Sequence, residues 1–198
     1  PILNIFEYSK QKLINYENEG GEKINFDINP QQKELGTREI NFSKELYIEN
    51  EDFQENPEDG FFRLSLGEEV RLKNAYIIKA VDIVKNKKGR VIEVLCEYDS
   101  KSRSGSNTTE SNRKVKGTIH WVSATDSVKA KVNIYDRLFK VPEPGKENDL
   151  INEVNQNSLE VKEAFVEPYL AESLEAQQFQ FQRLGYFVRT DNKKTLEF

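Results

Sequence analysis

Apolar and polar residues alternate along four runs between residues 61 and 139. The runs read FFRLSLGEEVRLKNAYIIKAVDIV, RVIEVLCEYD, RKVKGTIHWVSA and VKAKVNIYDRLF, and clusters of Gly, Asn and Ser separate them. Because a strand turns successive side chains to opposite faces, this pattern predicts antiparallel β-structure. Residues 70–84 and 91–99 are expected to pair as a hairpin over the KNKKGR turn, in which Gly89 is free to take a positive φ.

The flanking segments carry weaker patterns. We expect one or two short strands in residues 1–16, an alternating strand over 37–49 and a last strong strand over 178–188. Residues 141–175 are acidic and rich in proline, which predicts a connector with a short helix around residues 147–154. The predicted strands are too many for one small barrel, so two barrels, or a barrel and a sandwich, fit the length of 198 residues better.

The central β-rich block is positively charged. Residues 61–140 carry a net charge of about +8, whereas the whole chain carries −5. A positive block inside an acidic chain indicates a local patch for nucleic acid. The overall negative charge argues against non-specific binding, which depends on neutralising phosphates, but it allows a reader of a few exposed bases.

Composition narrows the class of protein further. The 12 Phe and 8 Tyr exclude a disordered chain. Cys96 is the single cysteine, so no internal disulfide can form, and a reducing compartment such as the cytoplasm fits. No run approaches about 18 consecutive apolar residues, so we expect no membrane span. The chain starts without Met and in mid-pattern, and we interpret it as a fragment or a processed piece.

Catalytic and metal-binding motifs are missing from the sequence. It holds no P-loop, GxSxG, HExxH or CxxC pattern. Alternation puts Cys96 on an apolar strand face and His120 on a polar one, which argues against a nucleophile pair. The usual structural zinc sites need four Cys or His ligands. We therefore expect no catalytic residue, metal or cofactor in this chain.

Two arginines near a turn are candidate ligand contacts. Arg63 and Arg71 flank a Leu-Ser-Leu-Gly segment. Guanidinium groups are planar, forked donors that suit base edges and phosphates. The alternative is that both pair with the neighbouring acids, Glu68 and Glu69.

A second candidate set lies near the C-terminus. There, polar Gln180, Gln182 and Arg183 interleave with aromatic Phe179, Phe181, Tyr186 and Phe187. An amide can read a splayed base by hydrogen bonding while a ring stacks on it. The alternative is an ordinary amphipathic strand.

Several blocks of sequence together resemble a known family. EVRLKNAYIIKA, RKVKGTIHWVSA, YDRLFKVPEP and FQFQRLGYF are similar, in this order and at similar spacing, to the C-terminal anticodon-binding region of glutaminyl-tRNA synthetase. The earlier GTREINFSKELYIENEDF resembles that family's GxRxxxFSxxLWIExxDF segment. The resemblance runs from about residue 12 to the end.

The resemblance implies an all-β fold of two six-stranded antiparallel β-barrels, one inserted in the other. Residues 1–25 and 126–198 would form the first, proximal barrel, and residues 26–125 the second, distal barrel. It also implies an upstream catalytic domain with HIGH and KMSKS signatures, which is absent from this sequence. The parent enzyme would attach glutamine to tRNA using ATP. This part would be non-catalytic and bind the anticodon loop of glutamine tRNA, as a cytoplasmic monomer.

The family's base-reading residues are carried over to matching positions. Arg63 matches the arginine that contacts the third anticodon base, and Arg71 the arginine near the first. Gln180 matches the glutamine that reads the central uracil, and Arg183 the arginine close behind it. The remaining candidates lie beside Arg71 and are Lys73 and Asn74.

The sequence also departs from the family pattern. Gly60 stands where a base-contacting glutamine is expected, and the chain ends at Phe198, where a further FNRTVxLxD segment should begin. Simple alternation puts Arg183 on the face of Phe181, opposite Gln180. Either a bulge turns Arg183 outward or it is a structural arginine.

Other interpretations stay open at this point. A glutamyl-tRNA synthetase of the same subclass shares the implied fold, although the blocks are more similar to the glutaminyl enzyme. A stand-alone RNA-binding β-barrel protein would fit the charge pattern. An all-β carbohydrate- or protein-binding module would show no dependence on RNA.

Overall fold

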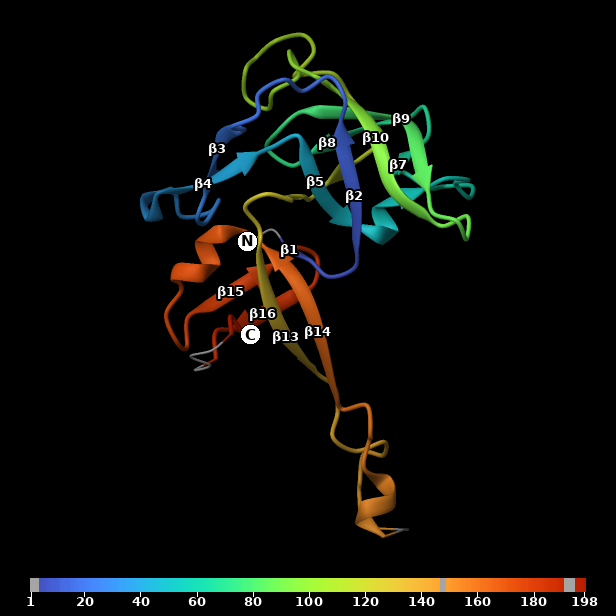
Figure 1. The fold of residues 1–198 in the computed structure, drawn as a ribbon. Coiled ribbons are helices and arrows are strands. Elements are labelled where there is room, and N and C mark those ends of the chain that lie inside the picture. Colours follow the sequence, from blue (N-terminus) through green and yellow to red (C-terminus); the bar gives the residue numbers. More distant parts are fainter. Residues whose placement is uncertain (1–3, 147–148, 191–194) are drawn as a thin grey trace.

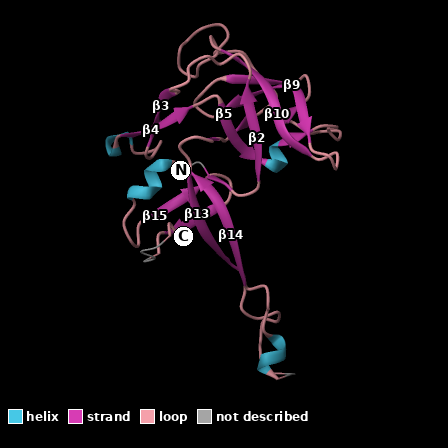
Figure 2. Cartoon of the chain, in the orientation of Figure 1, coloured by secondary structure: helices cyan, strands magenta, loops and turns pink. Residues whose placement is uncertain are grey.

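The regular secondary structure consists almost entirely of strands, which confirms the all-β prediction. The computed structural model describes residues 4–146, 149–190 and 195–198 (Figures 1 and 2). Helical structure in these ranges is limited to four short 3-10 turns: η1 (Lys33–Leu35), η2 (Asn50–Asp52), η3 (Leu150–Glu153) and η4 (Pro168–Glu172). The strands are β1 (Asn4–Ile5), β2 (Tyr8–Leu13), β3 (Glu22–Asp27), β4 (Thr37–Phe42), β5 (Glu45–Glu49), β6 (Phe53–Gln54), β7 (Leu64–Ser65), β8 (Glu69–Leu72), β9 (Ile77–Lys85), β10 (Val91–Asp99), β11 (Thr118–Ile119), β12 (Val122–Ser123), β13 (Val128–Tyr135), β14 (Leu159–Val166), β15 (Gln178–Phe181) and β16 (Gly185–Val188).

The largest sheet has seven strands in the order β11-β8-β9-β10-β2-β5-β12. Its centre is the predicted hairpin, β9 against β10, with Gly89 at a φ of 77° in the turn. The prediction of one strand over 70–84 was wrong, because the chain turns at Asn74, whose φ is 57°. β8 and β9 therefore pair with each other as a second hairpin.

Two other predicted strands are also divided by turns. The 37–49 segment forms β4 and β5, with Ser43 between them donating a 2.7 Å hydrogen bond to the carbonyl of Glu45. The 178–188 segment was expected to be one strand and is instead the antiparallel hairpin β15–β16. In both cases the apolar pattern places the strands correctly but does not reveal the turn between them.

The buried side chains form two separate clusters. The first core is centred on Phe42 and Trp121, whose rings meet edge to face at 5.4 Å, and it includes Leu13, Tyr16 and Ile24. The second core is made by β13, β14, the β15–β16 hairpin, Leu170 and Phe198. Residues 8–13 pair with β10 and β5 in the large sheet, while β1 pairs with β14. The division at residues 25 and 126 stays a prediction.

A buried ion pair joins the two cores. Arg38, on β4, donates from Nε and Nη2 to the carboxylate of Glu167, which precedes η4, and the Nη2–Oε1 distance is 2.9 Å. The two side chains are 3% and 0% exposed. Nη1 of Arg38 also donates to the carbonyl of Asp27 at 2.6 Å. These bonds fix the edge of the first core against the second.

The connector between β13 and β14 projects from the body as a long arm (Figure 1). The arm carries η3, whose first residues are capped by Asp149 accepting from the backbone N–H of Ile151. The helix expected around 147–154 is thus a 3-10 turn at Leu150–Glu153, while positions 147 and 148 lie outside the described residues.

Candidate nucleic-acid interface

Arg63 and Arg183 converge on one buried carboxylate, that of Asp52. Arg63 lies just before β7 and bonds Oδ1 of Asp52 through Nη1. Arg183 comes from the β15–β16 turn and bonds both oxygens, at 3.0 Å and 2.8 Å. The Asp52 side chain is fully buried, while the arginines are 37% and 29% exposed. The carboxylate thus holds two half-exposed guanidinium groups from opposite sides of the junction.

The position of Arg183 follows from its turn conformation. β15 ends at Phe181, and Arg183 has a φ of 66° in the turn before β16. Strand alternation does not apply there, so the side chain leaves the face on which Phe181 is buried. A hairpin turn, and not a bulge, directs Arg183 away from this face. Arg183 is therefore ion-paired with Asp52 and at the same time partly exposed to solvent.

Lys73 lies at the same junction. It follows β8, and its Nζ donates to Oε1 of Gln182 at 2.6 Å, so a first-core residue bonds the β15–β16 turn. Burial lowers the pKa of Lys73, and the nearby positive charge of Arg38 adds to this effect. The carbonyl of Lys73 accepts from Nε1 of Trp121 at 3.0 Å, which fixes this backbone to the first core.

Arg71 is directed to a different loop. Its Nη1 donates to the carbonyl of Ser102 at 2.9 Å and its Nη2 to that of Ser111 at 2.8 Å. Burial lowers the pKa of Arg71, with a further lowering from Arg113. The guanidinium therefore organises the Ser- and Asn-rich loop beside β8.

The proposed pairing of the two arginines with Glu68 and Glu69 was wrong. Among the described ion pairs, Glu68 bonds Lys116 at 3.0 Å and Glu69 bonds Arg113 at 3.4 Å. Arg63 pairs instead with Asp52, with Glu51 at 3.9 Å. The two acids are used instead by basic residues of the 113–116 segment, which is distant in the sequence but close in space.

Three hollows on the surface are lined by the candidate residues. The first, of about 600 Å³, contains Gln180. The second, of about 460 Å³, contains Arg63 and Arg183 together with Glu51, His120 and Lys162. The third, of about 410 Å³, contains Asn74 next to Ser104, a hydrogen-bond partner of Arg71. Gln180, the pair Arg63 and Arg183, and Asn74 therefore line separate hollows, while Arg71 and Lys73 line none of the three.

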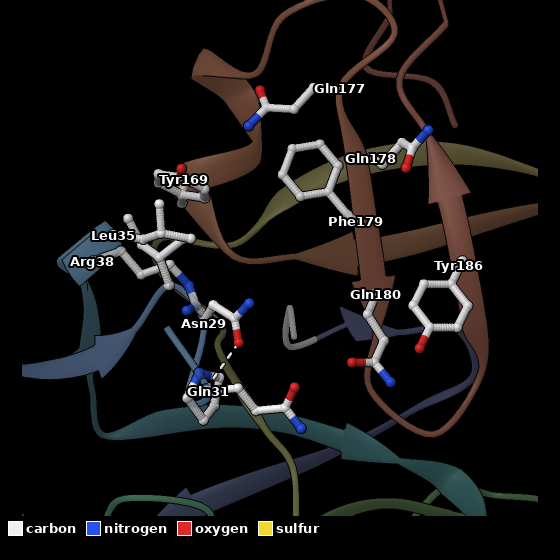
Figure 3. Close-up of a pocket in the computed structure, with 12 residues that line it drawn as sticks. Asn29, Gln31, Leu35, Arg38, Tyr169, Gln177, Gln178, Phe179, Gln180 and Tyr186 are labelled. Atoms are coloured by element: carbon white, nitrogen blue, oxygen red, sulfur yellow. Dashed lines mark hydrogen bonds between the residues drawn. The ribbon is translucent and has the colours of Figure 1, made fainter. Parts of the chain in front are cut away.

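The Gln180 hollow lies between the two cores. Figure 3 shows Gln180 and Tyr186 on the β15–β16 hairpin and Asn29 and Gln31 on the facing loop. Arg38, held by Glu167, also lines it. The hollow thus combines amide donors and acceptors with aromatic surface, which is the chemistry that a nucleobase needs.

Metal-ligating side chains do not gather in the described residues. There, no cluster of three or more His, Cys, Asp or Glu residues could hold a metal. Cys96 is buried in the first core, and burial raises the pKa of its thiol to about 12. None of the described helices is long and apolar enough to cross a membrane.

Comparison with protein families gives the same assignment to both halves of the chain. Two family models, both described as the anti-codon binding domain of tRNA synthetases class I (E and Q), match residues 5–99 and 118–190. The chain belongs to this family. The prediction from the sequence blocks is thereby confirmed.

Similar proteins named glutamine--tRNA ligase match this anticodon-binding domain along most of its length. Those of Pseudoalteromonas atlantica and Aliivibrio fischeri are 45% and 44% identical over 93% and 96% of the chain. That of Escherichia coli O157:H7 is 40% identical over 98% of it. The chain spans only 34–35% of the length of these relatives.

Two parts of the domain's interface were missed by sequence reasoning. Asp52 sits in a segment rich in acids, a composition typical of a solvated turn, although its side chain is fully buried. Arg38 and Glu167 are 129 residues apart, and nothing local marks them as partners. Only the resemblance of the GTREINF segment pointed to Arg38, and it assigned no role to that arginine.

Proposed function

We propose that this chain recognises the anticodon loop of glutamine tRNA as part of a glutamine–tRNA ligase. The observation that carries the proposal is the distribution of the candidate residues over three separate hollows. Three unstacked bases need three separate sites, each with its own donors and acceptors. Membership of the anticodon-binding family and the names of the relatives support the same conclusion.

Each hollow would take one base. Gln180 would read the central uracil with its amide, and Arg63 would donate to the third base. Nη1 of Arg63 bonds Asp52, and within the described part of the chain Nε and Nη2 stay available for a ligand. Arg71, with Lys73 and Asn74 beside it, would serve the first base by holding the 102–111 loop and the third hollow in place.

Specificity in this scheme comes from hydrogen bonds rather than bulk charge. The chain is acidic overall, with a net charge of −5, so phosphate attraction is limited to the positive central block. A good bidentate base contact discriminates by about 1–3 kcal/mol. We expect such contacts from Gln180 and Arg63 to separate the cognate loop clearly from loops with changed bases.

The proposal extends to the architecture and the parent enzyme. In the folded chain the seven-stranded sheet and the second core would belong to two six-stranded barrels, with residues 1–25 and 126–198 in the proximal one and residues 26–125 in the distal one. The parent ligase would use ATP in another domain and act as a cytoplasmic monomer. This chain would contribute binding and no chemical step.

Binding of the 198-residue chain to anticodon stem-loops tests the proposal. Fluorescence anisotropy would compare the glutamine loop, a loop with the central uracil changed and the glutamate loop, which differs at the third base, at two salt concentrations. We expect the glutamine loop to bind about 10-fold more tightly than the others. Equal affinities that fall steeply with salt would overturn it, since they would show a generic RNA surface.

A further inference from the structure

Tyr186 lies directly opposite Gln180 in the β15–β16 hairpin. The two residues are register partners, so their side chains leave the same face of the hairpin. Both line the hollow between the two cores, and Figure 3 shows their side chains next to each other. The tyrosine is 83% exposed, which is the highest exposure among the large hydrophobic residues of the described chain.

The ring of Tyr186 does not contribute to the packing of the hairpin. Its neighbour Phe187 provides that packing by stacking on Phe181 at 4.5 Å, and Phe181 in turn meets Phe198. Within the described residues, the Tyr186 hydroxyl has no hydrogen-bond partner and its ring has no aromatic partner. The exposed ring beside the Gln180 amide is therefore available to contact a bound ligand.

The geometry of amide recognition requires a second element. The amide of Gln180 holds its N–H donors and its carbonyl acceptor in one plane, and one donor with the acceptor can match the C=O and N–H groups along one edge of uracil. Those bonds form only if the base lies flat in that plane. A ring on the adjacent strand supplies such a surface, because bases stack on tyrosine faces irrespective of sequence.

We propose that Tyr186 is the stacking platform for the base that Gln180 reads. Gln180 would select the base by hydrogen bonding, and the ring of Tyr186 would hold that base in the orientation that these bonds need. Asn29 and Gln31 face the two residues across the hollow. This inference rests on the proposed function and adds a specificity residue to it. It predicts that Tyr186 contributes to stem-loop affinity only when a base occupies the hollow.

The test is a cycle of protein and RNA changes measured by anisotropy. The protein is the unmodified chain, Tyr186→Ala or Tyr186→Phe, and the stem-loop carries either uracil or an abasic site at the central anticodon position. We expect Tyr186→Ala to weaken binding to the uracil loop about 10-fold and to leave abasic-loop binding unchanged. Tyr186→Phe, which keeps the ring, should bind the uracil loop within about two-fold of the unmodified chain.

Tyr135 provides a matched control, because it is 76% exposed but lies at the end of β13, outside the Gln180 hollow. Tyr135→Ala should alter neither the affinity for the uracil loop nor that for the abasic loop. All variants should unfold at the same urea concentration. Equal losses by Tyr186→Ala on both loops would overturn the stacking role while leaving anticodon recognition intact. If the unmodified chain binds the uracil and abasic loops equally, central-base reading itself fails, and the inference fails with it.

Discussion

Asp52 and Arg183 form a doubly hydrogen-bonded ion pair although 131 residues separate them in the chain. The carboxylate is fully buried and also holds Arg63, so one side chain positions two candidate base contacts. Arg183 comes from the hairpin of the second core, whereas Asp52 and Arg63 flank the first core. The proposed pocket for the third anticodon base is therefore assembled only when the two cores meet.

Asp52→Asn tests this relationship. The substitution keeps the size of the side chain but leaves two arginine charges without their anion. Because both arginines keep about a third of their surface in water, we expect a loss of about 2–3 kcal/mol in the free energy of unfolding, measured by urea denaturation. Affinity for the glutamine stem-loop should fall about 10-fold as the guanidinium groups lose their positions.

Asp59→Asn is the control, since Asp59 is an exposed acid in the same segment. It removes the same charge and should change stability by less than about 0.5 kcal/mol. If Asp59→Asn weakened RNA binding as much as Asp52→Asn, the effect would be one of net charge rather than of arginine positioning.

Gly117 fixes the segment that carries Arg63. A Cβ atom at this position would lie 2.3 Å from the carbonyl oxygen of Phe62, next to Arg63 in the chain. Gly117→Ala must therefore displace this backbone, at a cost of about 1–3 kcal/mol in unfolding free energy. Stem-loop affinity should fall with it. Gly20→Ala, whose Cβ would meet its nearest atom at 3.6 Å, should leave both measurements unchanged.

The Arg38–Glu167 pair should be a major source of stability between the cores. Glu167→Gln leaves the buried guanidinium without its counter-ion, and we expect it to lower the free energy of unfolding by about 3–5 kcal/mol. Glu163→Gln, at an exposed position on β14 just before Glu167, serves as the comparison and should hardly change the free energy of unfolding. A similar small effect for both variants would show that the pair does not hold the junction.

The buried thiol of Cys96 should make the stability of the fold depend on pH in the alkaline range. Burial raises the pKa of its thiol to about 12 from the ordinary 9.0, so the unfolded chain loses this proton first. The contribution of the buried thiol to stability is complete below pH 9 and declines as the pH rises toward 12. At pH 8, a thiol reagent should label the folded chain far more slowly than the urea-unfolded chain. Rapid labelling of the folded chain would contradict the burial of Cys96.

Strand periodicity identified most of the β-structure, since alternation directly reflects which side chains are buried. It failed where a single residue reverses the chain: Asn74 and Arg183 both adopt positive φ inside segments expected to be continuous. Neither residue is a glycine, and the apolar pattern continues on both sides. Turns of this kind depend on packing around them and leave little trace in the local sequence.

The candidate site was predictable only in part. The resemblance supplied Arg63, Arg71 and Gln180. Gln180 and Arg63 line two distinct hollows, and Arg71 bonds Ser104, which lines a third. It did not supply Asp52, because a buried acid in an acidic segment looks like its solvated neighbours. Long-range ion pairs carry no local periodicity, so the contacts that join the two cores became visible only in three dimensions.

The most direct measurement is the binding of Gln180→Ala to two stem-loops, one with the central uracil and one with that base changed. The account predicts that the substitution weakens binding to the uracil loop about 10-fold and has little effect on the changed loop. Lys129→Ala, on β13 and outside the three hollows, should behave as the unmodified chain on both. Equal losses of affinity for the two loops on Gln180→Ala would contradict the reading of the central base by this residue.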